Sequence, residues 1–139
     1  MLASSRFAAA VHALVVLAKY GQKGPVCSSF VASSVNTNPV VIRRLMIDLE
    51  KAALVSSAAG RSGGFSLQRP ASSITLADIY KAVEPGGIFR IHKVDPSSKC
   101  PVGGQILKAL HSPFAIAENA LESALGHTSL NDIAGQIAV

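Results

Sequence analysis

The N-terminal part of the chain carries apolar side chains at helical spacing. A helix is predicted from about Ser5 to Tyr20, ended by Gly21 and the breaker Gly24-Pro25. The positions of its expected buried face recur every three or four residues: Phe7, Val11, Leu14, Val15 and Ala18. The same apolar run loosely imitates a secretory signal sequence, which is the alternative interpretation.

A helix, a tight turn and another helix are predicted next. Ser28 is expected to cap a short helix over residues 29–35, and Asn38 is expected to cap a longer helix that begins with Pro39. One face of the longer helix is apolar, with Ile42, Leu45, Met46 and Leu49. Its other face mixes cations with aliphatic side chains: Val40, Arg43, Arg44, Ile47 and Lys51. The pattern predicts a helix-turn-helix with a basic outer face.

The pattern changes to β-prone runs after Ala53. Residues 54–57 and 65–68 flank the glycine-rich segment 58–64, which predicts a β-hairpin. The tip carries a cation beside small residues that allow close approach to a partner surface: Arg61, Ser62 and Gly63. Helix-turn-helix followed by hairpin is the order of a winged helix-turn-helix.

The second half of the chain predicts further helices. Thr75 and Asp78 form a capping box for a helix that ends at Val83, and Ser129 and Asp132 form another cap. The irregular residues 84–104 lead to a short helix that ends at Leu110, and Ser112-Pro113 is expected to cap a longer helix through Leu125. An apolar row on the longer helix has little core of its own to cover it: Phe114, Ala117, Leu121 and Leu125.

These elements predict a mainly α fold with a small β-hairpin wing. Residues 1–83 are predicted to form a winged helix-turn-helix DNA-binding domain, and residues 84–139 a loop, a dimerisation helix and a possible sensor region. The uncovered apolar row predicts that the protein is a homodimer.

Composition and charge narrow the functional class. The 139 residues are 49% hydrophobic and 5% aromatic without tryptophan, which excludes disorder and favours a helical core over an all-β fold. No apolar run is long enough to span a bilayer, so no membrane association is expected. Residues 1–69 carry a net charge of +6 and residues 70–139 a net charge of −1. A basic half favours a polyanionic partner, and double-stranded DNA is the expected one.

The expected DNA contacts follow from the geometry of a helix in the major groove. Side chains at the start of the second helix of the motif should reach base edges or nearby phosphates: Asn38, Val40, Arg43 and Arg44. Other side chains should mainly anchor the phosphate backbone: Arg6, Ser28, Ser29 and Arg61. Taken one by one, these features are also ordinary solvated charges, turns and caps. A winged-helix module that binds protein is therefore the alternative, and no catalytic set stands out.

Several segments together resemble the Rrf-two (Rrf2) family of bacterial transcription regulators. The resemblance is carried by Asn38-Pro39, Ile42-Arg43, residues 49–52 (LEKA), residues 60–67 (GRSGGFSL) and residues 74–84 (ITLADIYKAVE). It implies a homodimeric repressor or activator, with the helix over residues 39–52 in the major groove and the wing on the minor groove or backbone. Ala53 replaces the usual glycine of the family before the wing.

The cysteines decide which branch of the family the chain resembles. Members that bind an iron–sulfur cluster carry three cysteines in the loop before the dimerisation helix, whereas this chain has only Cys100 there. The chain therefore resembles the cluster-free, YwnA-like branch, and no cofactor is expected. Four scattered histidines predict no metal site. Two cysteines are too few for a disulfide framework, which favours a reducing, cytoplasmic location.

Cys100 has two interpretations. Beside Lys99 and Pro101 it is expected near a helix N-terminus and a cation, which would make it an oxidisable thiol and the protein a redox-sensing regulator. A buried structural cysteine is the alternative. The operator sequence, the regulated genes and any small-molecule effector are not specified by the residues.

Overall fold

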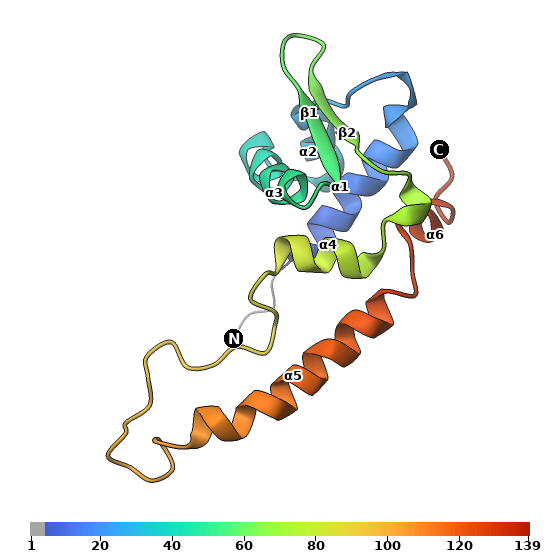
Figure 1. Cartoon of the computed structure of the whole chain (residues 1–139). Coiled ribbons are helices and arrows are strands. Elements are labelled where there is room, and N and C mark those ends of the chain that lie inside the picture. The colour runs from blue at the N-terminus through green and yellow to red at the C-terminus, as the bar shows by residue number, and fades with distance from the viewer. Residues whose placement is uncertain (1–4) are drawn as a thin grey trace.

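A bundle of helices and one hairpin make up the computed structural model, which describes residues 5–139 (Figure 1). The helices are α1 (Arg6–Tyr20), α2 (Ser28–Val35), α3 (Pro39–Lys51), α4 (Leu76–Val83), α5 (Ile106–Leu125) and α6 (Leu130–Ala134). Two 3₁₀ turns, η1 (Gly21–Lys23) and η2 (Ala71–Ser73), and two strands, β1 (Val55–Ala58) and β2 (Gly64–Leu67), complete the described elements. The predicted fold class, mainly α with a hairpin wing, is confirmed.

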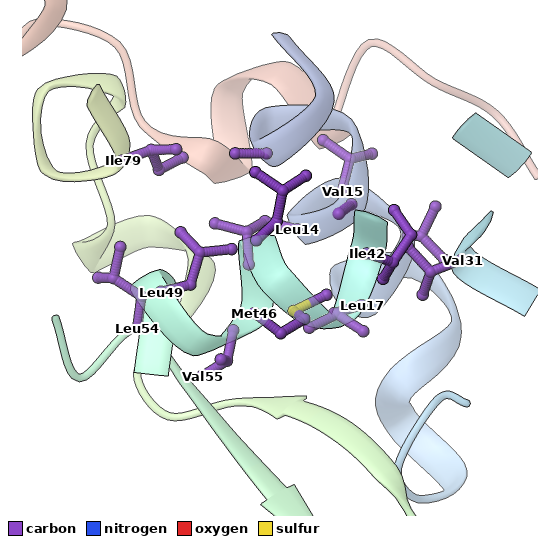
Figure 2. Close-up of a cluster of buried hydrophobic side chains, with 14 of the residues drawn as sticks. Leu14, Val15, Leu17, Val31, Ile42, Met46, Leu49, Leu54, Val55 and Ile79 are labelled. Carbon is purple, nitrogen blue, oxygen red and sulfur yellow. The ribbon is translucent and has the colours of Figure 1, made fainter. Parts of the chain in front are cut away.

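The apolar core lies between α1, α2, α3 and α4 (Figure 2). Leu14 of α1, Val31 of α2 and Ile42 of α3 are completely buried there, and Leu54 closes the core beneath the hairpin. The buried face of α1 differs from the predicted one. Leu14 and Val15 are buried as predicted, whereas Phe7, Val11 and Ala18 are only half-buried. Four further residues are buried: Ala10, Ala13, Val16 and Leu17. The apolar run of α1 therefore serves as the central helix of the core, because neighbours pack around most of its circumference.

The turn between α2 and α3 follows the prediction, but the start of α2 does not. Cys27, rather than Ser28, is the N-cap residue of α2, and it makes no capping hydrogen bond with its side chain. Val26 forms an isolated bridge with Phe65, which keeps the chain extended up to Cys27 and moves the first helical residue to Ser28. Asn38 caps α3 as predicted, since its side-chain oxygen accepts a hydrogen bond from the Val41 N–H at 3.1 Å.

The hairpin is antiparallel, and each strand lies one residue from its predicted position. Val55 pairs with Leu67 and Ala58 pairs with Gly64. Strand β2 of the wing is held against the segment before α2 by the Val26–Phe65 bridge. A Cβ at Gly64 would overlap the carbonyl of Val26, so only glycine fits at this crossing.

The predicted division of α5 at Pro113 is wrong. One continuous helix runs from Ile106 to Leu125 with Pro113 inside it. Proline removes a single helical hydrogen bond and keeps a helical φ, and good helix formers on both sides carry the helix through. The C-terminal half of α5 contacts α4, and Figure 1 shows the N-terminal half extending away from the other helices toward the long irregular loop between α4 and α5.

The last helix, α6, returns to the core beside α1. Leu130 is completely buried, and its N–H donates to the carbonyl of Ile74 at 2.7 Å. Both predicted capping boxes, at Thr75 and at Ser129, are present. α6 thus completes the core of the winged helix, although it lies C-terminal to residue 83, the predicted boundary between the two domains. Within residues 5–139, no helix is both long and apolar enough to cross a membrane.

Candidate DNA-binding surface

The outward face of α3 is basic and partly aliphatic, as predicted. Arg43 and Arg44 are exposed, Val40 is 46% exposed and Ile47 is 52% exposed. The opposite stripe of α3 is buried in the core: Ile42, Leu45, Met46 and Leu49. α3 is therefore fixed along one side and presents two guanidinium groups and two aliphatic side chains on the other. This combination matches the donors and methyl contacts that read base edges in the major groove.

Arg43 lies against the start of α2. Its guanidinium donates a hydrogen bond to the hydroxyl of Ser28 at 3.3 Å, so two predicted contact residues meet in space. Ser29 is exposed in the first turn of α2, where helical N–H groups and the helix dipole favour an anion. The α2 N-terminus and the basic face of α3 form one continuous surface.

Cys27 belongs to the same surface, although it was not among the predicted contact residues. Its thiol is exposed and lies 3.3 Å from the hydroxyl of Ser29. The hydrogen bond with Ser29, and then the backbone N–H of Phe30, lower the pKa of the Cys27 thiol below its ordinary value. In the sequence, only its position directly before Ser28 and Ser29, the predicted phosphate anchors, indicates that Cys27 belongs to this surface.

Arg6 is tied to α3 within the chain. Its guanidinium forms an ion pair with Asp48 at 2.5 Å, and both side chains remain partly exposed. Exposed pairs of this kind contribute only about 0–1 kcal/mol, so a phosphate could compete with Asp48 for the guanidinium. The pair places a cation beside α3 in the free protein.

The tip of the wing carries exposed Arg61 and Ser62. Gly63 closes the turn by donating its N–H to the carbonyl of Gly60 at 3.1 Å, and a side chain at Gly63 would overlap the backbone of the turn. The wing is also connected to α3, because the hydroxyl of Ser57 donates to a carboxylate oxygen of Glu50 at 2.9 Å. These contacts hold the wing in a defined position relative to the basic helix.

The apolar row on α5 is half-buried within one chain. None of residues 106–125 is buried, and the half-buried row contains Phe114, Ala117, Leu121 and Leu125. The ring of Phe114 packs against Phe89 with centroids 5.8 Å apart, while Ile116 on another side of α5 is 67% exposed. The dimerisation role of the row stays a prediction.

A buried hydroxyl connects α4 to α5. Tyr80 is 3% exposed and donates a hydrogen bond to the carboxylate of Glu118 at 2.5 Å. The other carboxylate oxygen accepts from the Ile88 N–H at 3.3 Å. Burial, followed by the hydrogen bond and negative charge of Glu118, raises the pKa of Tyr80 to about 12.

The interpretation of Cys100 as a buried structural cysteine is wrong, because the thiol is exposed. Cys100 also lies outside the helix N-terminus, since α5 begins only at Ile106. The backbone N–H groups of Gly103 and then Val102 lower the pKa of the thiol, whereas the sequence suggested that a neighbouring cation would lower it. The loop turns here because the N–H of Gly104 bonds to the carbonyl of Cys100 at 2.8 Å.

Together, the fixed helix, its basic face and the connected wing define the class as a winged helix-turn-helix DNA-binding regulator. Residues 3–136 match the sequence model of Rrf2, described as an iron-dependent transcriptional regulator. YwnA of Bacillus subtilis strain 168, a candidate HTH-type transcriptional regulator, is 38% identical over 131 residues, which cover 94% of this chain and 95% of that protein. The chain belongs to the Rrf2 family of transcriptional regulators, which are not enzymes.

Solved structures share the fold along nearly the whole chain. The crystal structure of a candidate DNA-binding protein has a TM-score of 0.72 and 36% identity, covering 93% of this chain and 98% of that chain. The structure of CymR, the global cysteine regulator of Bacillus subtilis, has a TM-score of 0.71 at 24% identity, with 99% of each chain covered. The CymR comparison is a likeness of fold.

Proposed function

We propose that the protein is a sequence-specific repressor that acts in the cytoplasm as a homodimer on double-stranded DNA. The observation that carries the proposal is the outward face of α3, where two exposed guanidinium groups lie beside a wing that is hydrogen-bonded to the same helix. A dimer would place two such helices on successive major-groove half-sites. The half-buried row on α5 is the surface that we assign to the second copy.

The contacts within the chain suggest different roles for the cations. Arg44 is exposed, and no hydrogen bond or ion pair holds it to the rest of residues 5–139, so we assign it and Asn38 to base edges. Arg43 shares its hydrogen bond with Ser28, so we assign this pair, with Ser29, to one phosphate. Arg6 and Arg61 would contact phosphates on either side.

The donor set does not fit an iron–sulfur cluster. The loop between α4 and α5 contributes a single thiol, that of Cys100, and within residues 5–139 no three possible ligands gather into a group. A cluster needs several thiolates or equivalent ligands, so we propose regulation without one. Anaerobic purification followed by iron and sulfide analysis tests this, and stoichiometric iron and sulfide would contradict it.

A thiol-based redox response is the second candidate function. Both cysteines are exposed, and their thiol pKa values are lowered by hydrogen bonds, which favours the reactive thiolate. The thiolate sulfur would attack one oxygen of hydrogen peroxide, forming an S–O bond as the O–O bond breaks, which gives a sulfenic acid and hydroxide. Peroxide should then change DNA affinity in the native protein and not in Cys100→Ser. An identical response in both proteins excludes Cys100, and Cys27→Ser then shows whether the other thiol responds.

The experiment that tests the proposed function is selection of binding sites from random duplexes, followed by fluorescence anisotropy with the selected duplex. Arg44→Ala should lose about 1–3 kcal/mol of binding and relax the preference at one base pair. Arg61→Ala should weaken all duplexes alike, because a phosphate contact carries no sequence information. Selection that enriches no sequence would overturn sequence-specific binding, and a monomer in sedimentation equilibrium would overturn the homodimer.

A further inference from the structure

A cavity of about 580 Å³ lies on the side of α1 that faces α6 and the end of the chain. Its walls are mainly apolar and include Phe7, Val11 and Val16 of α1, Leu76 of α4 and Ile133 of α6. Cavities of this size with apolar walls and a few polar groups are typical of small-molecule sites. The DNA-binding surface described above uses none of these apolar side chains.

The titratable side chains that line the cavity are two basic ones and the phenol of Tyr20. Lys19 and His12 both belong to α1, and no acidic side chain is among the lining residues of the described chain. Lys19 is half-buried and pairs with no carboxylate within residues 5–139. An unneutralised ammonium group beside apolar walls favours an anionic ligand with a hydrocarbon or aromatic body.

His12 connects the cavity to the helix-turn-helix. Its Nε2 is 2.8 Å from the hydroxyl of Ser34 on α2, and both residues line the cavity. α2 in turn supports α3, through buried Val31 in the core and through the hydrogen bond between Ser28 and Arg43. An anion that bonds to His12 would compete with Ser34 and change the support of α3.

We propose that the cavity is an effector site for amphipathic carboxylates, which lower DNA affinity by breaking the His12–Ser34 hydrogen bond. The hydrocarbon or aromatic body would fill the apolar part, and the carboxylate would lie between Lys19 and His12. The regulatory half of this inference rests on the proposed function. Ligand binding can be measured without DNA, so a failure of the ligand site can be distinguished from a failure of the proposed function.

The binding test uses decanoate and 1-naphthoate as probes, with decanol and naphthalene as neutral counterparts, in titration calorimetry of the full chain. At least one carboxylate should bind, and its neutral counterpart should bind roughly tenfold more weakly, as expected for loss of a charged hydrogen bond. Lys19→Met should weaken the carboxylate by a similar factor. Lys23→Met is the matched control, because Lys23 is exposed on η1 and does not line the cavity.

The coupling test compares DNA affinity with and without the bound carboxylate. The native protein should lose affinity in its presence, and DNA should weaken carboxylate binding by the same factor. Ser34→Ala should still bind the carboxylate, while its DNA affinity should no longer respond. Thermal unfolding of each variant establishes that it is folded.

Two results would overturn the proposal. Binding of neither carboxylate would exclude the site, as would equal binding by native protein and Lys19→Met. If Val11→Glu converts a dimer to a monomer while neither carboxylate binds, a second copy covers this face instead. If the protein binds a carboxylate but no DNA, the ligand site is supported, and only the proposed function is overturned.

Discussion

Replacing Ala53 by glycine should stabilise the protein. Ala53 has φ +60°, in the left-handed region, directly after the C-cap residue Ala52 of α3. Its N–H donates to the carbonyl of Glu50 at 2.9 Å, and the N–H of Leu54 donates to the carbonyl of Leu49 at 3.0 Å. This is the Schellman arrangement that ends many helices, and the buried pair Leu49 and Leu54 supplies its apolar contact.

The magnitude follows from two opposing terms. A left-handed conformation costs a residue with a Cβ about 1–2 kcal/mol relative to glycine. Glycine costs about 0.4–1 kcal/mol through the greater freedom of the unfolded chain. Ala53→Gly should therefore raise the free energy of unfolding by roughly 0.5–1 kcal/mol, and the midpoint Tm by about 2–3 °C. DNA affinity should not change, because the backbone path from α3 to the wing is kept.

Urea unfolding followed by circular dichroism measures the effect, at equal protein concentration because a dimer is stabilised by mass action. Ala52→Gly is the matched control. Ala52 has an ordinary negative φ of −86°, so glycine at this position relieves no backbone strain and should lower stability. If both variants lower the unfolding free energy equally, the assigned backbone strain at Ala53 is refuted.

Further predictions concern the wing, the link between α4 and α5, and the thiols. Gly64→Ala should cost about 1–3 kcal/mol in urea unfolding and weaken binding to all duplexes, since its Cβ would overlap the neighbouring backbone; unchanged stability would refute the assigned crowding. The raised pKa of Tyr80, about 12, favours the neutral phenol in the folded state, so its contribution is complete below pH 10 and lost as pH rises toward 12. Tyr80→Phe should lack that part of the alkaline loss of stability; an identical alkaline profile would contradict it. Bound DNA should slow iodoacetamide alkylation of Cys27 and leave that of Cys100 unchanged, as measured by peptide mass spectrometry; equal protection of both thiols would argue against the assigned surface.

The sequence predicted those parts of the fold that local chemistry decides. The Asn38-Pro39 cap, the two capping boxes and the glycine-rich hairpin each depend on side chains within a few residues, and the structure contains them all. The buried stripe of α3 follows directly from helical periodicity. These elements sufficed to define the winged helix and its basic face.

The errors have two origins: one is local, and the others depend on contacts between residues that are distant in the sequence. Ser112-Pro113 has the composition of a helix start, yet the helix passes through it because flanking residues favour continuation. Cys27 becomes the cap of α2 only because Val26 pairs with Phe65, which lies 39 positions away. The hydrogen bonds from Arg43 to Ser28 and from Ser57 to Glu50 were likewise invisible to spacing rules. Such contacts require the tertiary arrangement.

The salt dependence of DNA binding tests the central claim most directly. Anisotropy with the selected duplex, between about 50 and 200 mM salt, should give a log–log slope near −4.5 or steeper if about five phosphates are neutralised. Changing Arg43 and Arg44 together to Met should weaken binding and make the slope shallower by about 0.9 for each phosphate that is no longer neutralised. Lys93→Met, an exposed cation in the loop between α4 and α5, should leave the slope unchanged. Binding that does not respond to salt, or a slope that Lys93→Met changes as much as the two arginine substitutions, would contradict the assignment of α3 to DNA.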